Sequence, residues 1–257
     1  MTSPENSPFP TDSANSPKNE PKPLLPNPPA TWDLQAHLPQ LERDGLKATQ
    51  AHLIHALDHV GALLSARDYN WAVTGGLALF MHGFRDRARD TPDVDVVVEA
   101  STLDVLGALT DARIYRPPIL EVVSSGRGRF YVLTGPEFGD LGVQERGVVE
   151  VGLMPTGLHF GVPTTLSGTT TIKTADTAAG PRTYGVLSVP QLVSAKLYAL
   201  DLRDTERDLD DLEWLCLTFP HEFRDAADML GDKELLMGFV TKYREKNLEL
   251  QARAVRS

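Results

Sequence analysis

The alternation of apolar and polar positions first predicts a helix from Arg43 to Arg67. Apolar side chains recur there every three or four residues, which places them on one face of a helix. This face consists of Leu46, Leu53, Ile54, Leu57, Val60, Leu63 and Leu64. We expect the helix to pack on the core of the protein.

Shorter apolar runs then predict two strands on either side of one helix. Residues 69–76, YNWAVTGG, have the pattern of a strand that ends in two glycines, and residues 77–84 have helical spacing. Residues 93–100, DVDVVVEA, form the second expected strand. Ser101 and Asp104 then make a capping box that predicts the start of another helix.

The second half of the chain adds strands and ends in helices. Strand-like runs occupy residues 119–123, 130–134 and 148–154, while residues 157–185 are compatible with a hairpin or a loop. From residue 188 onward the apolar spacing is helical. The expected fold class is therefore α/β (α+β), with a small mixed sheet followed by a C-terminal helical region.

Composition divides the chain into three parts. Residues 1–30 hold nine of the 19 prolines and few apolar groups, which predicts a disordered tail. Its Pro-rich end is a solvated linker or a ligand for a protein partner that binds extended proline helices. We expect a core over residues 31–187 and a helical region over residues 188–257.

Charge and cysteine content narrow the class of protein. The net charge of -10 argues against a long nucleic acid as partner. Cys216 is the single cysteine, so no internal disulfide forms, and the chain opens without a secretory pattern. Its apolar runs fall short of the roughly 20 residues that span a bilayer. These features predict an intracellular, cytoplasmic protein that does not span a membrane.

The candidate chemistry lies on the second predicted strand. Asp93 and Asp95 are two residues apart, so their side chains share one face of the strand. Two adjacent carboxylates repel each other unless they share a proton or bind a divalent cation, and Mg²⁺ prefers oxygen ligands. The D-x-D pattern is also common at ordinary strand ends and turns.

The glycine pair Gly75 and Gly76 adds a second element. Between a strand and a helix, glycines let the backbone approach a ligand, and the first N–H groups of the helix then point at an anion such as a triphosphate. A tight turn without a ligand is the alternative. A phosphate cradle and a carboxylate pair at one sheet edge would explain why charge is tolerated in so apolar a strand.

These residues resemble a known family. The stretch 74–98, TGGLALFMHGFRDRARDTPDVDVVV, is similar to the signature of the nucleotidyltransferase superfamily, which shares the DNA polymerase beta-like fold. Arg89, Thr91, Asp93 and Asp95 match the R-x-T-x-D-h-D form of minimal and abortive-infection-type members.

The resemblance continues in the predicted helices. Residues 188–215 are similar to a segment in which the family carries a lysine and then a K/R-D-x-x-D-L motif. Lys196 fills the first place, and Arg207, Asp208, Asp211 and Leu212 fill the second. The resemblance covers residues 70–217, with residues 157–185 unmatched.

The family also implies a third carboxylate, for which Glu150 is the candidate in place of the usual aspartate. Carried onto this chain, the resemblance implies two Mg²⁺ ions held by Asp93, Asp95 and Glu150. A nucleoside triphosphate, ATP among the candidates, would then donate its nucleotide to a hydroxyl acceptor that the sequence does not identify. The alternative is a catalytically inactive relative that binds nucleotide or a protein partner. A D-x-D glycosyltransferase would leave the glycine pair and Lys196 unexplained.

Other polar residues leave two readings open. Lys196 reaches phosphate or extends its ammonium to solvent from an apolar helical face. Asp208 and Asp211 orient Lys196 or the nucleotide, or they form ordinary helix-surface ion pairs. Arg85, Arg87 and Arg89 either contact triphosphate or belong to a charged loop.

Three further features favour structural roles. His55 and His59 lie one helical turn apart, a spacing that fits zinc, but no third ligand accompanies them, which favours a solvent-facing pair. The stretch 124–130, SSGRGRF, favours a hairpin loop over an anion-binding turn. His82 and Cys216 are expected to be packed against apolar neighbours.

Overall fold

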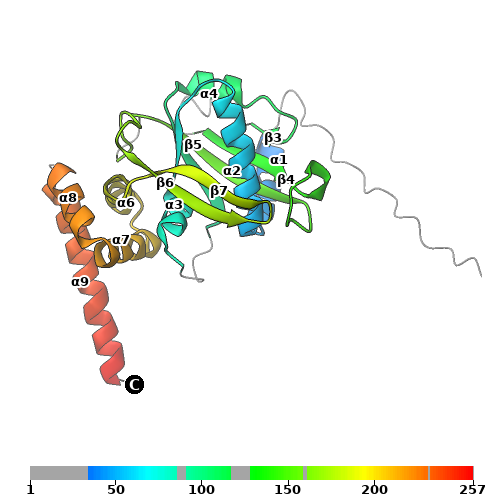
Figure 1. Cartoon of the computed structure of the whole chain (residues 1–257). Helices are drawn as coiled ribbons and strands as arrows, with labels where there is room; N and C mark the ends of the chain where they lie inside the picture. Colours follow the sequence, from blue (N-terminus) through cyan, green and yellow to red (C-terminus); the bar gives the residue numbers. More distant parts are fainter. Residues whose placement is uncertain (1–33, 86–90, 117–127, 159–160, 231, 257) are drawn as a thin grey trace, which may run out of the picture.

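The computed structural model describes residues 34–85, 91–116, 128–158, 161–230 and 232–256. They form a seven-stranded mixed sheet with helices on both faces, followed by a group of C-terminal helices (Figure 1). This confirms the predicted α+β class. The predicted tail, Arg87, Arg89 and the strand-like run at residues 119–123 lie outside the described residues.

The sheet has the strand order β3-β4-β5-β2-β1-β7-β6. Strand β2 is parallel to β5 and β1 is parallel to β7, whereas the other neighbours are antiparallel. Of the two readings of residues 157–185, the hairpin is correct, because β6 and β7 pair there. The strands are β1 (Trp71–Thr74), β2 (Asp93–Val98), β3 (Ile114–Tyr115), β4 (Gly128–Thr134), β5 (Gly147–Pro155), β6 (Thr170–Thr177) and β7 (Gly180–Leu187).

The single helix predicted from Arg43 to Arg67 is wrong, because two helices share this stretch. Helix α1 (Leu34–Gly45) ends before α2 (Gln50–Ser65) begins. Thr49 starts α2, since its backbone N–H donates to His52 Nδ1 at 3.0 Å. Leu46, assigned to the buried face, lies in the linker and is 74% exposed.

The other helices follow the sequence pattern closely. Ser101 caps α4, because its hydroxyl accepts the N–H of Asp104 at 3.2 Å. The change from sheet to helices falls between β7 and α6, at the predicted boundary of residues 187 and 188; the division into separate units stays a prediction. The helices are α3 (Gly75–His82), α4 (Thr102–Ala108), the 3-10 turn η2 (Pro136–Phe138), α6 (Val189–Arg203), α7 (Glu206–Thr218), α8 (Pro220–Leu230) and α9 (Lys233–Arg256).

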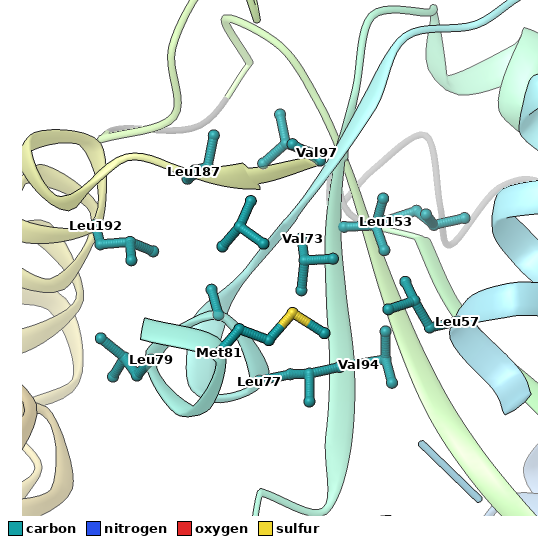
Figure 2. Packing of buried hydrophobic residues seen from close by; sticks show 14 of the residues in the cluster. Leu57, Val73, Leu77, Leu79, Met81, Val94, Val97, Leu153, Leu187 and Leu192 are labelled. Carbon is teal, nitrogen blue, oxygen red and sulfur yellow. The ribbon is translucent and has the colours of Figure 1, made fainter. Parts of the chain in front are cut away.

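The core is one cluster of buried side chains that runs from the sheet into the C-terminal helices. Leu57 of α2 and Leu192 of α6 both belong to this cluster and flank the strands on opposite sides of the view (Figure 2). A smaller cluster joins Leu41 of α1 to Tyr131 of β4. The hairpin of β6 and β7 at one edge of the sheet is less covered, since Thr174 and Thr183 are exposed there.

None of the helices in the described part of the chain is both long and apolar enough to cross a membrane.

Candidate active site

The three candidate carboxylates lie on two adjacent parallel strands. Asp93 and Asp95 are on β2, and the register places Glu150 of β5 directly beside Asp93. Paired residues of neighbouring strands share a face, so all three side chains lie on the same side of the sheet. Val94 and Val96, which point to the other side, are fully buried. The tertiary structure thus places Glu150 on the strand next to two aspartates that precede it by 55 and 57 positions in the sequence.

The glycine pair packs directly against this strand. Gly75 has φ +66°, and a Cβ on it would overlap the carboxylate of Asp95. A Cβ on Gly76 would lie 2.6 Å from the Thr91 hydroxyl and 3.5 Å from the Arg207 guanidinium. Only glycine therefore permits the start of α3 to lie this close to both.

Thr91 supports Asp93 from the preceding loop. Its hydroxyl donates to Asp93 Oδ1 at 2.8 Å, and the side chain is buried. This contact fixes the orientation of the carboxylate at the end of β2. Arg89, the other residue of the same motif, lies outside the described residues.

Lys196 belongs to a buried ion-pair network between α6 and α7. Its ammonium lies 2.7 Å from Asp211 Oδ2 and 3.2 Å from Asp208 Oδ1. Asp208 and Asp211 are each 2% exposed, which rules out the helix-surface reading of these charges. Of the two readings, the contacts fit the one in which Asp208 and Asp211 orient Lys196.

Asp208 has two further partners. The Arg203 guanidinium lies 2.8 Å from Oδ1, and the Thr205 hydroxyl donates to Oδ2 at 2.6 Å. Burial alone would raise the pKa of Asp208, but Lys196, Thr205 and Arg203 together outweigh it and lower that pKa below its ordinary value. Asp208 is therefore held as a carboxylate.

A cavity of about 380 Å³, which we name the Lys196 cavity, connects this network to the sheet. Gly75, Asp95, Lys196 and Arg203 line its polar part. Its other wall consists mainly of apolar side chains and one tyrosine: Met154, Leu158, Val162, Leu192, Ala195, Tyr198, Ala199 and Leu202. A polar end with both charge signs and an apolar wall suit a ligand that carries phosphates and a ring.

A second cavity of about 850 Å³, which we name the Arg207 cavity, adjoins the other glycine. Gly76, Thr91, Arg207 and Asp211 line it. Residues 46–50, which are the linker after α1 and the first residue of α2, also line it. The glycine turn therefore has one cavity beside each of its two residues. Arg85 lines the Arg207 cavity.

Glu150 has a cationic neighbour that the sequence reading missed. Arg129 of β4 lies 3.3 Å from Glu150 Oε1, with 54% of the Arg129 side chain exposed. Burial, and then the nearby charge of Glu150, raise the pKa of Tyr131, the β4 residue paired with Glu150.

Within the residues that the structure describes, no three His, Cys, Asp or Glu side chains are grouped closely enough to hold a metal ion.

The missed residues are Arg129, Tyr131, Tyr198 and Arg203. Strand pairing brings Arg129 and Tyr131 to Glu150, whereas Tyr198 and Arg203 lie two and seven residues after Lys196 on α6 and could have been found from helical spacing. Arg129 belongs to the stretch 124–130, for which the sequence favoured a hairpin loop. The part of this stretch that the structure describes, residues 128–130, is the start of β4. Residues 124–127 lie outside the described residues.

The histidines act as structural donors and acceptors. His55 Nε2 lies 2.8 Å from the Leu141 carbonyl, and His59 Nε2 lies 3.0 Å from Asp111 Oδ1. The expectation of a solvent-facing pair is wrong, since both rings are half-buried and bonded to separate partners. His82 Nε2 lies 2.9 Å from the Leu187 carbonyl, and Cys216 is half-buried beside the core.

No family model and no curated protein matches the sequence. Solved structures with a similar arrangement include an antigenic nucleotidyltransferase-like protein from Paracoccidioides brasiliensis. That structure has 14% identity and a TM-score of 0.47, and the alignment covers 74% of this chain and 93% of that one.

Two more similar structures have lower TM-scores. JHP933 from Helicobacter pylori has 15% identity and a TM-score of 0.43, covering 88% of this chain and 98% of that one. The antibiotic-resistance factor ANT(2")-Ia with adenylyl-2"-tobramycin has 15% identity and a TM-score of 0.38, covering 76% and 99%. At these scores the similarity concerns the arrangement of the chain, and the chemistry depends on its own residues.

Proposed function

We propose that this protein transfers a nucleotide from a nucleoside triphosphate to an acceptor hydroxyl with the help of Mg²⁺. One observation carries the proposal: Gly75 lies directly against Asp95, at the end of a strand whose Asp93 is paired with Glu150. A backbone turn that approaches carboxylates this closely suits a ligand in which phosphate oxygens and a cation meet.

The candidate carboxylates have the hard oxygen atoms that Mg²⁺ prefers, but among the described residues three such side chains are not grouped closely enough to hold one ion by themselves. Asp93 and Asp95 offer hard carboxylate oxygens on one face, and Glu150 is the third candidate ligand, on the neighbouring strand. Bound there, Mg²⁺ would neutralise charge on the reacting phosphate. Thr91 keeps a carboxylate oxygen of Asp93 in a fixed direction through its 2.8 Å hydrogen bond. Two ions, as the family implies, are part of this proposal.

The polyphosphate of the nucleotide would occupy the polar end of the Lys196 cavity. The first N–H groups of α3 follow Gly75 and Gly76 there, and Lys196 and Arg203 supply positive charge. Asp208 and Asp211 hold the Lys196 ammonium in place, so these two carboxylates are positioning residues. The base would lie against the apolar wall beside Tyr198.

The test combines binding and transfer. Mg²⁺ with ATP or GTP at a hundredfold excess over Kd should stabilise the wild-type protein by about 2.7 kcal/mol. Label from the α-phosphate should move to an acceptor supplied by cell extract. Asp95→Asn should lose both effects and keep its melting temperature without ligand, because the change removes only an anionic ligand. Asp201→Asn, on an exposed part of α6, is the control. Transfer that persists in Asp95→Asn would refute the metal role.

A nucleotide-binding protein without transfer activity is the second candidate. The Arg129–Glu150 ion pair favours it, since a cation beside Glu150 competes with a metal ion for the same carboxylate. Stabilisation by Mg²⁺ and nucleotide, with no transfer to any acceptor in the extract, would support this function instead.

A further inference from the structure

The Arg207 cavity lies where an acceptor would have to approach. If the nucleotide fills the Lys196 cavity, the acceptor needs a separate space that reaches the same carboxylates. Gly76 and Thr91 line the Arg207 cavity, and the Thr91 hydroxyl donates to Asp93. The two cavities thus lie beside consecutive glycines, with Asp95 lining one and the partner of Asp93 lining the other.

The charge of the Arg207 cavity is opposite to that of the whole chain. Three cationic side chains of the described residues line it, namely Lys47, Arg85 and Arg207, and Lys47 also forms an ion pair with Asp44 at 3.2 Å. Among the described residues, the acidic one in its lining is Asp211, which forms an ion pair with Lys196 at 2.7 Å. A cavity of this charge in a chain of net charge -10 favours an anionic ligand.

Two of these cations are placed by neighbouring groups. A Cβ on Gly76 would lie 3.5 Å from the Arg207 guanidinium, so this group reaches the glycine turn itself. The Arg85 guanidinium lies over the Phe80 ring at 3.9 Å from its centroid. Planar guanidinium groups favour phosphate, because they donate two parallel hydrogen bonds.

Aromatic side chains give the cavity a second property. Phe80 and Phe84 both line it, and the Phe84 ring is stacked on Trp214 with 4.7 Å between centroids. Fixed aromatic rings beside cationic groups suit a planar ring attached to phosphate.

We infer that the Arg207 cavity binds the acceptor, and that this acceptor is a hydroxyl compound bearing a planar ring and at least one phosphate. The inference rests on the proposed function, which it extends from donor to acceptor. In the transfer, the acceptor oxygen forms a bond to the α-phosphorus, the bond from that phosphorus to the bridging oxygen breaks, and pyrophosphate leaves. The proton of the acceptor hydroxyl passes to water.

The experiment uses calorimetric titration of the full chain with four probes. They are adenosine 5′-monophosphate, adenosine, a short oligoribonucleotide and a polycationic aminoglycoside, each added with the triphosphate site saturated by a non-hydrolysable ATP analogue and Mg²⁺. The monophosphate should bind and adenosine should bind about tenfold more weakly, because it lacks the charge-assisted hydrogen bonds. The aminoglycoside should not bind. Tighter binding of the oligoribonucleotide would identify a strand end as the source of the phosphate, and equal binding would identify a free nucleotide.

A pair of arginine variants separates the two cavities. Arg207→Gln should weaken binding of the monophosphate by about tenfold and leave binding of the ATP analogue unchanged. Arg203→Gln, in the Lys196 cavity, should do the reverse. Arg244→Gln on an exposed part of α9 should change neither, and melting curves will verify that all three variants fold.

The outcomes distinguish this inference from the proposed function. If the ATP analogue binds but the monophosphate does not, the acceptor inference is wrong and the nucleotide site stands. The same holds if adenosine and the aminoglycoside bind as tightly as the monophosphate. If the ATP analogue itself does not bind, the proposed function fails first.

Discussion

Two groups of acidic residues in this protein differ in how their charge is balanced. In the helical cluster, Asp208 and Asp211 are 2% exposed, and Lys196 lies within 3.2 Å of both. In the strand cluster, Asp93 and Asp95 at the start of β2 and Glu150 within β5 are half-buried, and Asp95 lines a cavity. In the first cluster the cation is a buried lysine, whereas the arginine beside Glu150 in the second cluster is 54% exposed. Burial therefore distinguishes the carboxylates that stabilise the fold from those that we propose to bind a ligand.

The largest expected effect on stability comes from the helical cluster. Asp208→Asn should lower the free energy of unfolding by about 3 kcal/mol, because it leaves Lys196 and Arg203 without a buried anionic partner. Asp210 lies on the same helix as Asp208 and forms a more exposed ion pair with Lys246 of α9. Asp210→Asn is therefore the matched control and should cost about 0.5 kcal/mol. Urea unfolding at neutral pH measures both variants. An equal loss in the two variants would break the comparison.

The pH dependence of stability sharpens the same contrast. The pKa of Asp208 is lower in the folded protein than in the unfolded chain, so its contribution is fully present above the unfolded pKa of about 3.9. That contribution is lost as the pH falls through the lower, folded value. Wild-type protein should therefore lose stability more steeply than Asp208→Asn between about pH 4 and pH 2. Parallel acid-unfolding curves for the two proteins would contradict this.

The next effect concerns the glycine turn beside the strand cluster. Gly75→Ala should cost about 2 kcal/mol for a side chain at positive φ, and more because the new Cβ meets Asp95. Gly168→Ala is the control, since Gly168 has φ +73° and open space around it. Thermal melts with and without Mg²⁺ and ATP should show that only Gly75→Ala loses the stabilisation by nucleotide. Retained stabilisation would remove the turn from the site.

A smaller effect is expected at the ion pair between Arg129 and Glu150. Arg129→Gln should change stability by about 0.5 kcal/mol or less, because the arginine is largely exposed. If Glu150 binds metal, removing the competing cation should lower the Mg²⁺ concentration for half-maximal transfer about twofold. Arg146→Gln, in the pair with Glu137, is the control. A higher Mg²⁺ requirement in Arg129→Gln would contradict a ligand role for Glu150.

The smallest effect should follow from removing residues 1–30. Their composition provides too few apolar groups for a core, so the deletion should leave the melting temperature of the protein nearly unchanged. Calorimetry of the shortened chain measures this. A large fall in melting temperature would mean that the segment packs against the domain.

The sequence by itself determined the elements that short-range patterns control. Alternating valines around Asp93 and Asp95 predict β2, because a strand exposes its side chains with a period of two. The glycine pair predicts the turn into α3, since the positive φ of Gly75 suits a residue without a side chain. The break between α1 and α2 was missed because it depends on Thr49 and His52, and His52 is in turn held by the Glu145 carbonyl across the fold.

Only the tertiary structure decided which charges meet. The register of β2 with β5 places Glu150 beside Asp93, and the register of β5 with β4 brings Arg129 to Glu150. The packing of α7 on α6 converts Asp208 and Asp211 from apparent surface charges into buried partners of Lys196. Local sequence cannot specify these pairs, because strand register and helix packing depend on contacts between residues far apart in the chain.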